Sequence, residues 1–159
     1  MFKIMFICHG NICRSPMAEF IFKDICEKYG VSDKYYSQSS ATSTEEIWGD
    51  VGNPVYPPAR EELKKHGIDC SGKHAVQVTR ADYQNYDLLI CMDSNNVRNL
   101  KRIIGSDTEG KIHKLLEFAG RVGDVSDPWY SLDFETCYRD IYDGCTGLLE
   151  YLEGGNSNA

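Results

Sequence analysis

The sequence predicts an α/β fold, a single domain in which a four-stranded, parallel, twisted sheet has helices on both faces. Two observations support this prediction: strand-like segments alternate with helical ones along the chain, and no repeat or linker divides it. Strands separated by helices form right-handed crossovers, so their carboxyl ends lie at one edge of the sheet. We therefore expect the functional residues at that edge.

Four strands are expected, at residues 3–7, 35–38, 87–92 and 112–115. Four helices are expected between and after them, at residues 16–29, 58–66, 97–104 and 134–152. Ser15 is the expected N-cap of the first helix, with Pro16 at its first position, and Asp133 is the expected N-cap of the last. Residues 1–153 are expected to form the domain, and residues 154–159 a disordered tail.

The composition argues against several classes of protein. The formal net charge is -7 and no basic run is longer than Lys64-Lys65, which argues against a nucleic-acid surface. No apolar stretch is long enough to span a bilayer, and the N-terminus lacks the apolar core of a signal peptide. Seven scattered cysteines do not form the pattern of a secreted disulfide framework. We expect a cytoplasmic protein without membrane insertion, and favour a monomer.

The most informative segment is Cys8-His9-Gly10-Asn11-Ile12-Cys13-Arg14-Ser15-Pro16, directly after the first predicted strand. Gly10 permits a close approach of the backbone, and Asn11 tolerates a positive φ. A loop of this kind between a strand and a helix can direct its N–H groups at an oxyanion, which the helix N-terminus also attracts. We therefore predict a phosphate-binding loop between the first strand and the first helix, with Cys8 at its floor.

Cys8 and Arg14 suit the nucleophilic transfer of a phosphoryl group. A free cysteine is only about 3% thiolate at pH 7, so the anion needs stabilisation by the loop N–H groups, the Arg14 charge and the Ser15 hydroxyl. The planar guanidinium can also hold two phosphoryl oxygens at once. The phenolate leaving group of a phosphotyrosine needs a proton from an acid. Asp127, followed by Pro128-Trp129-Tyr130, is the candidate acid, although an Asp-Pro pair is also a common start of a turn.

Three separated motifs resemble, in their order, those of the low-molecular-weight protein tyrosine phosphatases, a family of small cytoplasmic enzymes. The motifs are the segment from Cys8 to Pro16, Cys91-Met92-Asp93 with Asn96, and Asp127-Pro128-Trp129-Tyr130. The resemblance covers essentially the whole chain. It implies hydrolysis of phosphotyrosine in proteins and of small aryl phosphates, with no metal and no cofactor, and inhibition by phosphate-like anions.

The resemblance also implies a role for each residue of the site. Cys8 would be the nucleophile that forms a phosphocysteine, Arg14 the phosphate clamp, and Asp127 the acid and then the base. Cys13 would form a reversible disulfide with Cys8, which guards against overoxidation. The phosphate loop would be completed, and the pocket lined or supported, by His9, Gly10, Asn11, Ile12, Ser15, Ser39, Trp48, Trp129 and Tyr130.

Three points stay open at this stage. Asp93 can take part in the proton network of the pocket or can cap the helix that follows Ser94. The segment from Thr42 to Pro54 looks longer than in many relatives, so the side chain that lines the pocket there is not defined, and neither is substrate preference. Where many members have a histidine that supports the loop asparagine, this chain has Lys73-His74, and either residue could supply the contact.

Other functions could use the same loop. An arsenate reductase needs a relay of further cysteines, and Cys70 and Cys91 lack the short spacing of such a relay. A protein arginine phosphatase favours a threonine where this chain has Ile12, and a small polar wall where it has Trp129-Tyr130. A thiol redox module or a passive phosphate-binding module would not need the Asp-Pro-aromatic segment.

Overall fold

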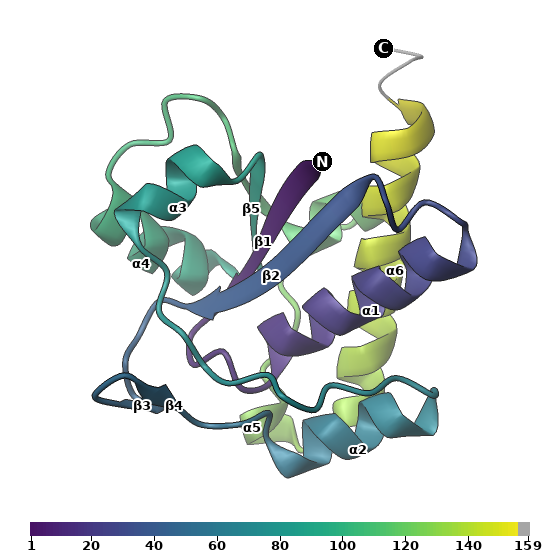
Figure 1. Cartoon of the computed structure of the whole chain (residues 1–159), viewed down its shortest axis with the longest axis horizontal. Helices are drawn as coiled ribbons and strands as arrows, with labels where there is room; N and C mark the ends of the chain where they lie inside the picture. The colour runs from purple at the N-terminus through teal and green to yellow at the C-terminus, as the bar shows by residue number, and fades with distance from the viewer. Residues whose placement is uncertain (156–159) are drawn as a thin grey trace.

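The computed structural model describes residues 1–155, which Figure 1 shows together. The main sheet has four parallel strands in the order β2-β1-β5-β6. Their bounds are Phe2–Cys8 for β1, Tyr35–Ala41 for β2, Leu88–Cys91 for β5 and Ile112–Lys114 for β6. The predicted fold class, an α/β domain built on a four-stranded parallel sheet, is confirmed.

Different helices cover the two faces of the sheet, because successive side chains of a strand point to opposite faces. The helices are α1 (Arg14–Lys28), α2 (Pro57–Lys65), α3 (Arg80–Asn85), α4 (Ser94–Ile104) and α6 (Phe134–Glu150). Ile4 and Phe6 of β1 pack in the core under α1, α2 and α6. Met5 and Ile7 pack in a second core under α3 and α4, so the helices flank the sheet on both sides (Figure 1).

The start of α1 differs from the prediction. The helix begins at Arg14 instead of residue 16, and the prediction that Ser15 is its N-cap is wrong. Cys13 holds the cap position, with no hydrogen bond from its side chain to the helix. The Ser15 hydroxyl contacts Cys8 and Asn11 inside the loop instead, and a hydroxyl with those partners is not available to cap the helix.

Several short elements that the sequence did not predict lie between the long ones. They are β3 (Ile47–Trp48), β4 (Val51–Gly52), α3, the 3₁₀ turn Leu115–Ala119 and α5 (Pro128–Ser131). Each is shorter than two helical turns or one typical strand, so none has enough residues for a periodic pattern to be recognised. The antiparallel hairpin of β3 and β4 matters most, since it lies in the segment from Thr42 to Pro54, for which the sequence did not define the side chain that lines the pocket.

The last helix begins as predicted, because Asp133 caps it by accepting a hydrogen bond from the Thr136 N–H at 3.0 Å. After Glu150 the chain continues as a helical turn, Tyr151–Gly155. The sequence places residues 154 and 155 in a disordered tail, but they belong to this turn, and residues 156–159 lie outside the described part. None of the described helices is long and apolar enough to cross a membrane. The cytoplasmic location and the monomeric state stay predictions.

Candidate active site

The loop between β1 and α1 is held in shape by the side chain of Asn11. Asn11 has a φ of 59°, the left-handed conformation that asparagine tolerates. Its Nδ2 donates to Ser15 Oγ at 2.8 Å, and its Oδ1 accepts from the Val76 N–H at 3.1 Å. The loop is therefore fastened both to the first turn of α1 and to the segment that follows α2.

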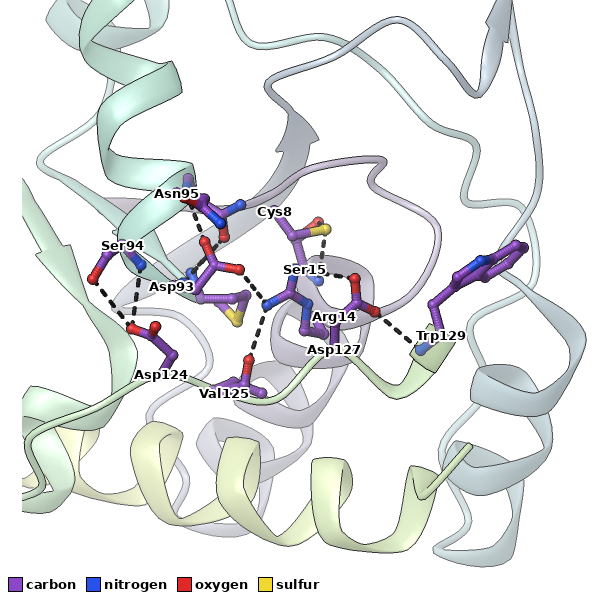
Figure 2. A network of polar contacts seen from close by, with 12 residues as sticks. Cys8, Arg14, Ser15, Asp93, Ser94, Asn95, Asp124, Val125, Asp127 and Trp129 are labelled. Carbon is purple, nitrogen blue, oxygen red and sulfur yellow. Dashed lines mark hydrogen bonds and ion pairs between the residues drawn. The ribbon is translucent and has the colours of Figure 1, made fainter. Parts of the chain in front are cut away.

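The Cys8 sulfur lies at the floor of this loop and is surrounded by donors. The backbone N–H groups of Asn11 and Ser15 point at Sγ from 3.3 and 3.4 Å. The Ser15 hydroxyl lies 3.0 Å from the same sulfur. Figure 2 draws this contact. Only 4% of Cys8 is exposed, and the start of α1 adds the positive end of a helix dipole. This environment can stabilise negative charge on the sulfur.

Arg14 is buried beside the sulfur and is fixed by two partners. Its Nη1 donates to Asp93 Oδ2 at 2.8 Å and to the Val125 carbonyl at 2.9 Å (Figure 2). Its Nη2 lies 3.8 Å from Asp127 Oδ2. Burial by itself lowers the pKa of Arg14, but the negative charges of Cys8, Asp93 and Asp127 raise it by more. The guanidinium therefore stays charged at the wall of the site.

Asp93 combines a contact with the site and the capping of the next helix, the two alternatives that the sequence left open. Its Oδ1 accepts from the Asn96 N–H at 2.7 Å and caps α4, while its Oδ2 holds Arg14. Asn96 in turn accepts through Oδ1 from the backbone N–H groups of Met92 and Asp93. The helix cap and the contact with the site thus use the two oxygens of one carboxylate.

Asp127 lies at the opening of the site, at the start of α5. Its Oδ1 accepts from the Trp129 N–H at 3.0 Å, which makes Asp127 the N-cap of this short helix. Its other oxygen, Oδ2, is the one that faces Arg14 (Figure 2). About a third of the side chain is exposed, so the carboxyl group is in contact with water as well as with the site.

These residues enclose one cavity of about 290 Å³. Its lining contains Cys8, Arg14, Asp127, the loop residues between Cys8 and Arg14, Trp129, Tyr130, Glu45 and Glu46. The Trp129 ring packs on Tyr56 with 4.9 Å between ring centroids, which fixes one aromatic wall. The cavity has a polar floor and a partly aromatic mouth, which suits a phosphorylated ring.

Two of the residues predicted to line or support the pocket lie elsewhere. Ser39 donates to Glu19 Oε1 of α1 at 2.6 Å and does not bond to the phosphate loop, whose contact with β2 is made by the Ser40 carbonyl. Trp48 belongs to β3, is 68% exposed and does not line the cavity. The hairpin turns its side chain outward, and the preceding residues, Glu45 and Glu46, face the cavity instead.

Lys73 and His74 do not contact the loop asparagine, whose partner is the Val76 N–H. Lys73 Nζ donates to the Ser39 carbonyl at 2.8 Å and lies 3.6 Å from Glu19 Oε1. Burial lowers the pKa of Lys73, and the Glu19 carboxylate opposes that effect. His74 bonds through Nδ1 to the Gly52 carbonyl. The pair thus supports the base of the site and the hairpin, not Asn11 directly.

Cys13 lies between the cavity, whose lining it joins, and the core that contains Cys137 of α6. A hydrogen bond with Cys137, followed by burial, raises the pKa of Cys13. Cys8 and Cys13 are free thiols here, as are the other five cysteines. A disulfide between Cys8 and Cys13 therefore stays a prediction, and its formation would separate Cys13 from Cys137.

The fold and the site define an α/β domain with a loop of converging N–H groups at the carboxyl edge of its sheet and a cysteine at the floor of that loop. Residues 3–157 match the family model described as "Low molecular weight phosphotyrosine protein phosphatase". The chain belongs to this family, and the resemblance recognised in the sequence is confirmed.

Known relatives match over nearly the whole chain. The low molecular weight protein-tyrosine-phosphatase YfkJ of Bacillus subtilis is 36% identical over 155 residues, which cover 96% of this chain and 97% of that protein. Its crystal structure superposes with a TM-score of 0.91 and 34% identity, covering 98% of this chain and 96% of that one. The Gallus gallus low molecular weight phosphotyrosine protein phosphatase is 39% identical over 93% of this chain and 94% of its own. A Drosophila arginine phosphatase structure matches with a TM-score of 0.85, 26% identity and coverage of 96% and 99%.

Proposed function

We propose that this protein hydrolyses phosphotyrosine in proteins, and small aryl phosphates, through a phosphocysteine at Cys8. The supporting observation is the convergence of Cys8 and Arg14, from one loop, and Asp127, from a distant segment of the chain, on one cavity. A passive phosphate-binding site needs neither a sulfur at its floor nor a carboxyl group at its mouth. The names of the relatives support the choice of phosphotyrosine as the substrate.

In the first step Cys8 Sγ attacks phosphorus, and the S–P bond forms as the bond to the tyrosine oxygen breaks. The loop N–H groups and Arg14 hold the remaining phosphoryl oxygens, whose charge they stabilise as the group moves. Asp127 gives its proton to the departing phenolate oxygen. Since Oδ1 of Asp127 is occupied by the Trp129 N–H, Oδ2 is the oxygen that carries the proton.

In the second step a water molecule attacks the phosphocysteine. The Asp127 carboxylate, now deprotonated, takes a proton from this water, the S–P bond breaks, and phosphate leaves with the sulfur again a thiolate. The Ser15 hydroxyl and the two loop N–H groups that face Sγ support the thiolate as the leaving group of this step. No electron transfer and no further reactant are required.

The walls of the cavity favour an aromatic phosphate ester over phosphoarginine. Ile12 and Trp129 both line the cavity, and Tyr130 extends the aromatic wall at its mouth. An apolar and aromatic wall packs well against a phenyl ring, and the Ile12 side chain offers no hydrogen-bond acceptor to a guanidinium. We expect phosphotyrosine peptides to be hydrolysed faster than matched phosphoarginine peptides, and vanadate to inhibit as a phosphate mimic.

The decisive test is detection of the covalent intermediate. The enzyme is mixed with a phosphotyrosine peptide carrying labelled phosphate and is quenched within a single turnover, and the labelled residue is identified by peptide mapping. Label on Cys8 is the expected result. Turnover without label on Cys8 would contradict the proposed mechanism. Faster hydrolysis of phosphoarginine peptides than of matched phosphotyrosine peptides would contradict the proposed substrate.

A further inference from the structure

The lining of the cavity contains two acidic side chains from the segment before β3, in addition to the aromatic wall. Glu45 and Glu46, just before the β3–β4 hairpin, both line the cavity. Glu45 accepts a hydrogen bond from His9 Nε2 of the phosphate loop at 2.9 Å, and 69% of its side chain is exposed. Glu46 accepts from Asn53 Nδ2 at 3.0 Å and is partly buried.

These two carboxylates are built into the site because their segment is fastened to the phosphate loop. The N–H of Thr42 donates to the Cys8 carbonyl at 3.0 Å, and the N–H of Ser43 donates to the His9 carbonyl at 3.0 Å. Glu46 also packs close to Gly10, where an added Cβ would lie 3.3 Å from its Cγ. The two carboxylates are therefore held in the wall of the cavity that a phosphorylated side chain would enter.

His9 offsets the charge of Glu45 only when its ring is protonated, and Glu46 pairs with the neutral amide of Asn53. Arg14 is the one lysine or arginine of the lining, and it is buried and bonded to Asp93. A substrate residue next to the phosphotyrosine stays at the mouth, where it meets Glu45 and Glu46. Opposite charges attract there, and like charges repel, which sets specificity more than raw affinity.

We propose that Glu45 and Glu46 select phosphotyrosine sites that are flanked by lysine or arginine and reject sites flanked by aspartate or glutamate. The proposal rests on the function proposed above. The phosphoryl group is bound at the floor regardless of sequence, and the two carboxylates read the charge of its neighbours. Each exposed charge pair changes kcat/KM by about 1.4- to 5-fold.

The test compares two synthetic peptides that differ only in their flanks, one with arginine and one with glutamate on both sides of phosphotyrosine. The measured quantity is the ratio of their kcat/KM values, which we expect to favour the arginine peptide by about 5- to 20-fold at low salt. The variants Glu45→Gln and Glu46→Gln keep the acceptor oxygens for His9 and Asn53 but remove the charges. Each should lower the ratio about 2- to 5-fold, and the double variant should bring it near one.

A matched control removes one carboxylate far from the mouth. Glu109 lies in the connection between α4 and β6, at the opposite edge of the sheet. Glu109→Gln should leave the ratio of the two kcat/KM values unchanged. A wild-type ratio near one, or an equal drop in Glu109→Gln, would overturn the proposal, the latter by assigning the effect to net charge. Failure to hydrolyse either peptide, or a small aryl phosphate, would instead refute the proposed function itself.

Discussion

The floor and the mouth of the cavity are held in different ways. At the floor, the Cys8, Asn11 and Ser15 side chains are buried and bonded to one another within one short segment. At the mouth, Trp129 is 53% exposed and the Glu45 side chain 69% exposed, and they come from segments far apart in the chain. Under the proposed function the difference separates two tasks: the floor determines which group is transferred, and the mouth determines which molecule delivers it.

Removal of the sulfur tests the floor and has the largest expected effect. Cys8→Ser should lower phosphotyrosine turnover by about 10⁴-fold or more, because the hydroxyl is a far weaker nucleophile at neutral pH. Binding of inorganic phosphate, measured by calorimetry, should persist since the loop N–H groups and Arg14 remain. Cys70→Ala, at a cysteine outside the loop, serves as the control and should keep its turnover. A Cys8→Ser enzyme with near-normal turnover would separate the loop from catalysis.

Asp127 lies between the two regions, and its substitution comes second. Asp127→Ala should lower turnover of phosphotyrosine by about 10²- to 10⁴-fold, but that of an activated aryl phosphate much less, because its leaving group needs no proton. Asp127→Asn can still accept from the Trp129 N–H and so keeps the α5 cap. Equal losses of turnover in Asp127→Ala and Asp127→Asn would show that the loss comes from the missing proton donor. A normal rate in Asp127→Asn would show that it comes from the missing α5 cap instead.

Asp93 tests whether the floor needs a charged support behind Arg14. Asp93→Asn keeps an acceptor for the Asn96 N–H but loses the charge opposite Nη1 of Arg14. A charge-assisted hydrogen bond is worth about 1 kcal/mol more than a neutral one, so kcat/KM should fall about fivefold to tenfold. Thermal unfolding measured in parallel should show a Tm only about 2–4 °C lower, because the same bond is lost from the folded state. A large drop in Tm would point to a loss of the α4 cap.

Asp107 lies far from the cavity, in the connection between α4 and β6, and its substitution should not affect activity. Asp107 accepts from the Tyr83 hydroxyl and from the N–H groups of Lys111 and Ile112. Burial raises the pKa of Asp107, but these hydrogen bonds lower it by more, so the net shift is downward. Asp107→Ala should reduce the free energy of unfolding by about 1–2 kcal/mol at pH 7 with kcat/KM unchanged.

The sign of this shift fixes the pH dependence of that loss. A carboxyl group with a lowered folded pKa contributes stability above its unfolded pKa, near 3.9, and loses it as the pH falls through the folded value. The difference between the wild type and Asp107→Ala in urea unfolding should therefore be full at pH 7 and shrink below about pH 4. A difference that grows in acid would contradict the assignment.

The floor could be read from the sequence because its parts are contiguous. Cys8, Asn11 and Ser15 lie in one run after an apolar strand, so a single motif places all of them. The support of Asn11 could not be read, since its partner is the backbone N–H of Val76, and a backbone group leaves no signal in the residue types. Ser15 was wrongly predicted as a helix cap for a related reason. A serine hydroxyl can cap a helix or can bond to other side chains of a loop, and only the folded position of Cys8 shows that Ser15 does the second.

The mouth was harder to predict because its elements are short. In a strand of two residues no alternation shows which side chains face the cavity, and a shift of one residue reverses the assignment. Trp48 was therefore an unsafe choice from the sequence, and the structure places Glu45 and Glu46 there instead. Asp93 shows the opposite case. Its two interpretations looked exclusive, but a carboxylate has two oxygens, and both interactions occur together.

Gly52 ties the hairpin to a part of the chain that does not line the cavity. A Cβ at this position would lie 1.8 Å from the Ala75 carbonyl oxygen, so every other residue type would push the hairpin away from the strand-like segment after α2. Ala75 also donates to the Asn53 carbonyl, and Asn53 holds Glu46. A change in the shape of this hairpin therefore requires matching changes in two stretches of the sequence, the hairpin itself and the segment around Ala75. If the hairpin alone were transferred to a relative, Glu45 and Glu46 would not be held in the same position.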